Sequence, residues 1–226
     1  MKSVLMSIHP KWCKLIASGK KTIEVRKTKP IIETPFKCYI YCTHDNSKNA
    51  LHLYVNSGYG RKEIGVIGNW RSGKDVVDVN PHLPAYRYNA YLAEGKVIGE
   101  FVCDDVDIYS YDYCDGVDID DDSLLCTMLE RDEINYYAKG KTSYGWHISD
   151  LKIYDKPKKL SEFSVADKKA IRQCKSRLQN YYAFTDTGYI KNGFICTEKY
   201  DWCIGCKMKA LTRPPQSWCY VEEIES

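Results

Sequence analysis

The stretch Gly19-Lys-Lys-Thr-Ile-Glu-Val-Arg26 decides the fold, because a helix ends and a strand begins there. Upstream, Pro10 can start a helix at little cost, since the first helical residue needs no N–H partner. The glycine at position 19 supplies the left-handed conformation that ends many helices. Apolar and polar side chains then alternate, which is typical of a strand with one buried face. The polar face of this strand carries Glu24 and Arg26.

Further short strands are predicted on both sides of this stretch. Apolar runs bounded by glycine, proline or acidic residues lie at 3–8, 37–43, 95–104, 144–154 and 217–223. Asp122-Ser123 can cap a second helix that carries Leu124, Leu125, Met128 and Leu129. Many short strands with two or three helices predict an α+β fold, built as a small mixed β-barrel flanked by helices.

We expect a single domain over residues 1–226 with two insertions. The first lies near 44–90, where glycine and proline residues interrupt every regular pattern. The second lies near 161–212 and combines a basic, partly helical segment with a cysteine-bearing excursion.

Positive charge is concentrated near the N-terminus, although the formal net charge of the chain is only +3. The segment from Lys2 to Lys29 contains eight lysine or arginine residues and a single acidic residue, Glu24. Such a region can attract phosphate groups, but a charge cluster can equally be ordinary solvated surface. Both interpretations stay open on charge alone. No apolar window is long enough to span a membrane, so we expect no membrane association.

The chain contains eleven cysteines, a high and odd number. The N-terminus lacks the apolar segment of a signal peptide, so we expect a cytoplasmic protein in which clustered thiols bind metal before they form disulfides. Cys203 and Cys206 form a C-x-x-C pair that Cys174 and Cys196 precede. These four thiolates could hold a structural zinc ion. The alternative is that they are separate reduced thiols.

The pattern Gly19-x-Lys21-x-x-Glu24-x-Arg26 resembles the G-x-K-x-x-E-x-R signature of the ASCH superfamily. The terminal Pro-Pro-Gln-Ser-Trp218 sequence resembles that of prophage-type ASCH proteins. The other similar segments follow in the expected order: Ser7-Ile-His-Pro10, Tyr39-Ile-Tyr-Cys-Thr43, Gly95-Lys-Val-Ile-Gly-Glu-Phe101, Trp146-His-Ile148, Lys156-Pro157 and Arg213–Val221. The resemblance implies a PUA-like β-barrel, similar to EVE and YTH domains, which recognise RNA or modified bases.

The resemblance also implies a cleft beside the first helix that binds RNA, a nucleoside or a nucleotide. Lys21 and Arg26 can contact phosphate or the carbonyl edge of a base, and Glu24 can accept a hydrogen bond from an exocyclic amine. The expected neighbours in the cleft are Ser7, Lys20 and Thr43. Trp146 or Trp218 could offer a stacking face, although both also fit as core residues.

A nucleoside-directed hydrolase is the first alternative. Some ASCH proteins that this chain resembles are amidohydrolases acting on N4-acetylcytidine, and others have been linked to ribonuclease activity. Lys21 and Glu24 would then be the catalytic residues. However, Glu24 occupies the position of the family's threonine and favours the charged form of Lys21. The family's distant glutamate could be Glu100, Glu130 or Glu133. A protein-interaction module of a mobile element is the second alternative.

Overall fold

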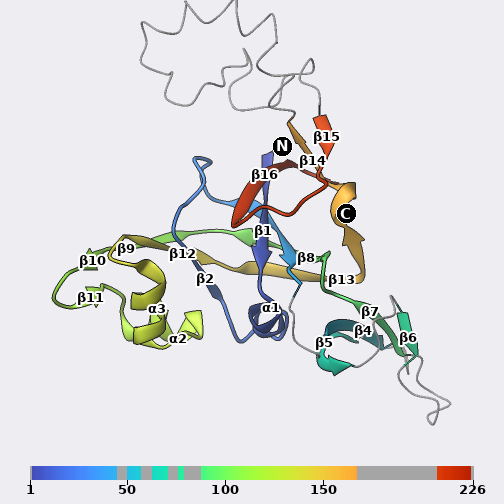
Figure 1. The fold of residues 1–226 in the computed structure, drawn as a ribbon, viewed down its shortest axis with the longest axis horizontal. Coiled ribbons are helices and arrows are strands. Elements are labelled where there is room, and N and C mark those ends of the chain that lie inside the picture. Colours follow the sequence, from blue (N-terminus) through green and yellow to red (C-terminus); the bar gives the residue numbers. More distant parts are fainter. Residues whose placement is uncertain are drawn as a thin grey trace, which may run out of the picture.

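The computed structural model describes residues 2–44, 50–56, 63–70, 76–78, 88–166 and 208–224. A five-stranded mixed sheet forms the centre of the fold (Figure 1). Its order is β13 (Ser149–Lys159), β8 (Lys96–Cys103), β3 (Phe36–Cys42), β1 (Lys2–Ile8) and β16 (Trp218–Glu222). β1 and β3 run parallel, whereas the other neighbours are antiparallel. The first and last strands of the chain are therefore direct partners.

A three-stranded antiparallel sheet lies beside the central sheet. Its order is β2 (Ile23–Arg26), β12 (Ser143–His147) and β9 (Val106–Tyr109). Glu24 is paired with Trp146, and Arg26 is paired with Tyr144. Side chains that are opposite one another in such a pair share a face of the sheet, so Glu24, Arg26 and Trp146 point the same way.

Three helices complete this part of the molecule: α1 (Pro10–Ala17), α2 (Asp121–Thr127) and α3 (Arg131–Ala138). The expected limits of α1 are confirmed, since Pro10 begins it and Gly19 follows its end with a φ of +71°. α2 begins before the predicted cap, because Asp120 accepts the hydrogen bond from the Ser123 N–H at 2.8 Å. No helix in the described ranges is long and apolar enough to cross a membrane.

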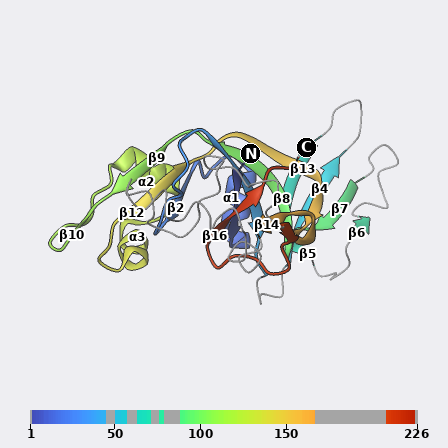
Figure 2. The ribbon, with the colours of Figure 1, turned by 90° about the horizontal axis from the view of Figure 1, so that it is seen from above.

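The remaining strands form smaller sheets. Figure 2 shows a four-stranded sheet at one end of the molecule and a short hairpin at the other. The first comprises, in spatial order, β5 (Glu63–Trp70), β4 (Ala50–Asn56), β7 (Tyr88–Leu92) and β6 (Val76–Asp78); the hairpin comprises β10 (Tyr111–Asp112) and β11 (Gly116–Val117). A 3-10 turn, η1 (Leu160–Glu162), leads into β14 (Ser164–Ala166), which pairs with β15 (Met208–Ala210). The four-stranded sheet coincides with the first predicted insertion, except that β7 ends two residues beyond it at Leu92. Most of the second insertion lies outside the described residues.

Apolar side chains cover both faces of the central sheet. Alternate residues of β1 and β3 enter two separate clusters, because side chains of a strand point to opposite faces in turn. Val4, Met6, Ile8, Cys38, Ile40, Cys42, Ile98 and Trp146 belong to the first cluster, and Leu5, Tyr39, Tyr41, Val97, Tyr154, Phe163 and Val221 form the second. A third cluster packs α3 against the three-stranded sheet through Val25, Tyr109 and Ile134.

The predicted α+β fold is confirmed, with mixed sheets and flanking helices. Among the described strands, no pairing joins the five-stranded sheet to the three-stranded one, so they form no closed barrel. The expectation of a half-buried β2 is wrong, because all four of its residues are buried. Val25 packs toward α3, and the opposite face with Glu24 and Arg26 is enclosed by the first cluster and the C-terminal segment.

Replacing Gly19 with alanine should lower the free energy of unfolding by about 1 kcal/mol, the cost of a left-handed conformation for a residue with a Cβ. Nothing lies within 4 Å of that Cβ, so no steric clash adds to this cost. Gly19→Asn is the matched control and should lose less, because asparagine visits this conformation readily. Urea unfolding of the three proteins measures the difference. Equal stability of the alanine variant and the wild type would contradict the left-handed backbone conformation of residue 19.

Candidate functional site

The three charged residues of the signature form one buried network. Lys21, Glu24 and Arg26 expose only 2%, 6% and 8% of their surface. One carboxylate oxygen of Glu24 lies 3.4 Å from Lys21 Nζ, and the other lies 2.9 Å from Arg26 Nη2. Glu24 therefore separates two cations that would otherwise repel each other in a medium where charges are weakly screened.

Lys21 joins the network to the end of α2. Its ammonium donates a hydrogen bond to the carbonyl of Thr127, the last residue of that helix. The next N–H, of Thr22, donates to the Cys126 carbonyl at 3.1 Å. The last carbonyls of a helix have no intrahelical partners and carry partial negative charge, so a buried ammonium is well placed there. Burial lowers the pKa of Lys21, and the nearby carboxylate of Glu24 opposes that shift.

Arg26 joins β2 to both ends of the chain. Its Nη2 donates to the Ser7 carbonyl at 2.8 Å, and its Nη1 lies 3.5 Å from Ser217 Oγ. Ser7 Oγ donates to the carbonyl of Pro215 at 2.7 Å, and the Ser7 N–H donates to the Ser217 carbonyl at 2.9 Å. The pairing of β1 with β16 brings these distant residues together. The guanidinium thus fixes the segment that precedes β16.

Two buried donors at this site have no acceptor among the described residues. They are Arg26 Nε and Trp146 Nε1, which belong to neighbouring strands and to side chains on the same face. An N–H group without a partner costs about 1–3 kcal/mol when it is buried. Such groups are rare in native proteins, and each one points to a water, an ion or a ligand that completes it.

The two predicted stacking residues differ in their surroundings. Trp146 is fully buried and packs edge-on against Phe36, with ring centroids 5.6 Å apart. Trp218 is partly exposed, lies 5.8 Å from the Trp146 ring and donates from Nε1 to Thr28 Oγ1 at 3.0 Å. Of the two, only Trp218 presents ring surface to solvent.

The structure brings Ser7, Lys21, Glu24 and Arg26 into direct contact. Of the other expected residues, Lys20 is exposed and Thr43 is half-buried, with its N–H donating to the Ile8 carbonyl at 2.9 Å. Sequence reasoning missed three partners of the network. Thr127 acts through a backbone carbonyl, which has no sequence signal. Ser217 lies inside the terminal Pro-Pro-Gln-Ser-Trp218 motif, and Trp12 lies in α1. The Trp12 ring centroid lies 5.1 Å from Lys21 Nζ.

No described contact joins Lys21 to the three candidate catalytic glutamates. Glu100 accepts a hydrogen bond from the Tyr154 hydroxyl, and it is paired with Tyr39, so it lies with the second cluster on the other face of the central sheet. Burial and this bond raise the pKa of Tyr154. Glu130 and Glu133 are exposed and form the capping box of α3.

The expected zinc ligands Cys174, Cys196, Cys203 and Cys206 lie outside the described residues, so the structural zinc ion stays a prediction. By contrast, four other thiols are fully buried in the first cluster: Cys13, Cys38, Cys42 and Cys103.

Comparisons with known proteins agree with the resemblance in part. The ASCH domain model matches residues 6–110, which include the signature. A crystal structure of ASCH from Zymomonas mobilis is similar at 16% identity and a TM-score of 0.40, covering 70% of this chain and 73% of that chain. A mutant of that protein is similar at 15% identity and a TM-score of 0.39, covering 71% and 77%. No curated protein matches the sequence. The prophage-type relationship and the cytoplasmic location stay predictions.

Replacing Glu24 with alanine should lower the free energy of unfolding by about 3–5 kcal/mol, because two buried cations would lose their shared partner. The matched control is Asp121→Ala. Asp121 also lies 2.9 Å from an arginine, Arg131, but its side chain is almost fully exposed. An exposed pair contributes about 1 kcal/mol at most. Chemical unfolding of both variants compares the two losses, and equal losses would mean that the network has no structural importance.

Proposed function

We propose that this chain binds RNA, with the Lys21–Glu24–Arg26 network recognising an unpaired base and nearby lysines contacting the phosphates. The observation that carries the proposal is the pair of buried donors without acceptors, Arg26 Nε and Trp146 Nε1, beside the carboxylate of Glu24. Two donors and one acceptor on one face complement the mixed edge of a nucleobase. The match to the ASCH domain supports the proposal, since the resemblance implies RNA or modified-base recognition.

The surface near the network favours a phosphate backbone. Exposed lysines lie in α1 and before and after β2: Lys11, Lys14, Lys20, Lys27 and Lys29. Glu24, the single acidic residue between Lys2 and Lys29, is buried and already shared between two cations. Binding to single-stranded RNA would use this surface for affinity and the network for base recognition, a division that is usual in nucleic-acid recognition.

Binding of a fluorescent single-stranded RNA to the full chain should weaken as salt rises. The double variant Lys14→Ala/Lys20→Ala should reduce the slope of log K against log salt by about 1.4, because each phosphate contact on a single strand accounts for about 0.7. Both side chains are exposed, so the fold should be unaffected. Lys152→Ala/Lys156→Ala, which removes two exposed lysines from β13, is the matched control and should keep the wild-type slope. An RNA affinity that does not depend on salt concentration, or equal slopes in both double variants, would contradict the proposal that these lysines contact the phosphates.

A nucleoside-directed hydrolase is the second candidate, and the lowered pKa of Lys21 favours it. A lysine that loses its proton more easily can act as a base or a nucleophile. Against it, the ammonium is held by Thr127 and Glu24, and Lys21 has no described contact with Glu100, Glu130 or Glu133. We therefore place binding first.

Incubation of the chain with N4-acetylcytidine and with labelled RNA separates the two functions. If the chain only binds, neither substrate is consumed beyond the buffer control. Turnover by the wild type that Lys21→Met abolishes would establish the hydrolase instead, provided that the variant unfolds at the wild-type urea concentration. Turnover that survives in Lys21→Met would come from a contaminant or from another site.

A further inference from the structure

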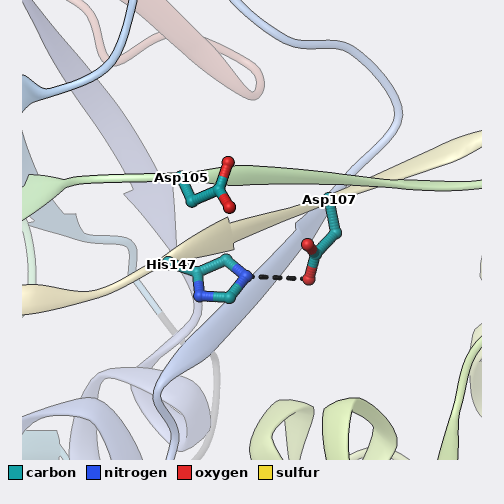
Figure 3. A group of neighbouring side chains, drawn as sticks. All are labelled: Asp105, Asp107 and His147. Atoms are coloured by element: carbon teal, nitrogen blue, oxygen red, sulfur yellow. Dashed lines mark hydrogen bonds and ion pairs between the residues drawn. The ribbon is translucent and has the colours of Figure 1, made fainter.

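Three potential metal ligands meet outside the charge network. Asp107 lies on β9, Asp105 immediately precedes that strand, and His147 ends β12. One ligand atom from each of the three lies within 4.8 Å of the other two. Figure 3 shows the three side chains turned toward one another, with the imidazole of His147 bonded to the carboxylate of Asp107. His147 lies 40 positions after Asp107 in the sequence, and the pairing of β9 with β12 brings them together.

The separations fit a shared cation. His147 Nε2 lies 2.8 Å from Asp107 Oδ2. Metal–ligand distances of roughly 2.0–2.2 Å place neighbouring ligand atoms about 3 Å apart, and opposite ones about 4 Å apart. The distances between the ligand atoms are therefore already close to those around a bound metal ion, so only small movements of the side chains are needed.

Backbone and side-chain contacts hold the ligands in place. The N–H of His147 donates to the Asp105 carbonyl at 3.0 Å, which ties the start of β9 to β12. The hydroxyl of the buried Tyr109 donates to Asp107 Oδ2 at 2.9 Å. The Tyr109 ring lies over Gly145, where any Cβ would collide with it. Hydrogen bonds of this kind orient the ligands in known metal sites.

Charge and exposure favour a hydrated ion. In the described ranges, neither Asp105 nor Asp107 forms an ion pair with a lysine or an arginine. The imidazole of His147 is therefore the one basic group described beside these two carboxylates. Asp105 is exposed, and the side chains of Asp107 and His147 keep 31% and 35% of their surface. Solvent can reach the cluster, so water could fill the remaining coordination positions.

We propose that Asp105, Asp107 and His147 bind one divalent transition-metal ion. Two carboxylate oxygens with one imidazole nitrogen suit manganese, iron or zinc, whereas magnesium and calcium prefer oxygen alone. The site is separate from the charge network, because His147 and Trp146 are neighbours in a strand and so point to opposite faces of the sheet. It also uses none of the four cysteines that could bind zinc.

Manganese is the sharpest probe, because the eleven thiols of the chain attract zinc but not Mn²⁺. Titration of the full chain with Mn²⁺, followed by the loss of the free-ion signal in electron paramagnetic resonance, counts bound ions. We expect one ion per chain, and an affinity that falls at least about tenfold in Asp105→Asn and in His147→Gln. Asp104→Asn is the matched control: it removes an adjacent exposed carboxylate outside the cluster and should bind as the wild type does.

Thermal unfolding separates a lost ligand from a damaged fold. Without metal, Asp105→Asn should unfold at the wild-type temperature, since its side chain is exposed. Added Mn²⁺ should raise the unfolding temperature of the wild type and of Asp104→Asn, but not that of Asp105→Asn. The proposal is overturned if the wild type shows no saturable Mn²⁺ binding, or if Asp104→Asn loses as much affinity as Asp105→Asn, which would mean diffuse attraction to an acidic surface.

Discussion

The carboxylate of Glu24 is the group on which the arrangement of this protein depends. It holds Lys21 and Arg26 on its two oxygens, and each cation reaches a different part of the chain, the end of α2 and the junction of β1 with the C-terminal segment. A buried ion pair contributes little net stability, because removing charges from water cancels most of the attraction. Its value is positional: β2, the end of α2 and the junction of β1 with the C-terminal segment are fixed around one carboxylate.

The same carboxylate decides between binding and catalysis. Burial makes the ammonium of Lys21 easier to deprotonate, but Glu24 stabilises the charged form, and the ammonium donates a stronger hydrogen bond to the Thr127 carbonyl than a neutral amine would. A lysine in this setting serves better as a fixed donor than as a base. The network is nevertheless incomplete, because Arg26 Nε and Trp146 Nε1 have no described acceptor. A purely structural network would be expected to satisfy them.

Sequence patterns predicted the elements better than their surroundings. Pro10 and Gly19 marked the limits of α1 correctly, because both residues restrict the backbone locally. The alternation around Glu24 indicated a strand but wrongly implied an exposed polar face, since alternation shows only that two faces differ. The grouping of Lys21 with Arg26 came from a family resemblance. Thr127 could not be found, because it acts through a backbone carbonyl. The terminal motif contains Ser217, but long-range strand pairing leaves no local signal that would place this residue beside Arg26.

The two proposed sites lie on opposite faces of β12, because successive side chains of a strand point to opposite faces. Trp146 enters the core beside Glu24, while His147 turns toward Asp107 on the opposite face. Gly145, which precedes Trp146, has no side chain and so gives Tyr109 the room to reach Asp107. A one-residue shift of β12 against its neighbours would exchange the faces and destroy both arrangements at once. A change to one proposed metal ligand, by contrast, leaves the pairing of β2 with β12 intact, so the Lys21–Glu24–Arg26 network and the proposed metal site can be lost independently.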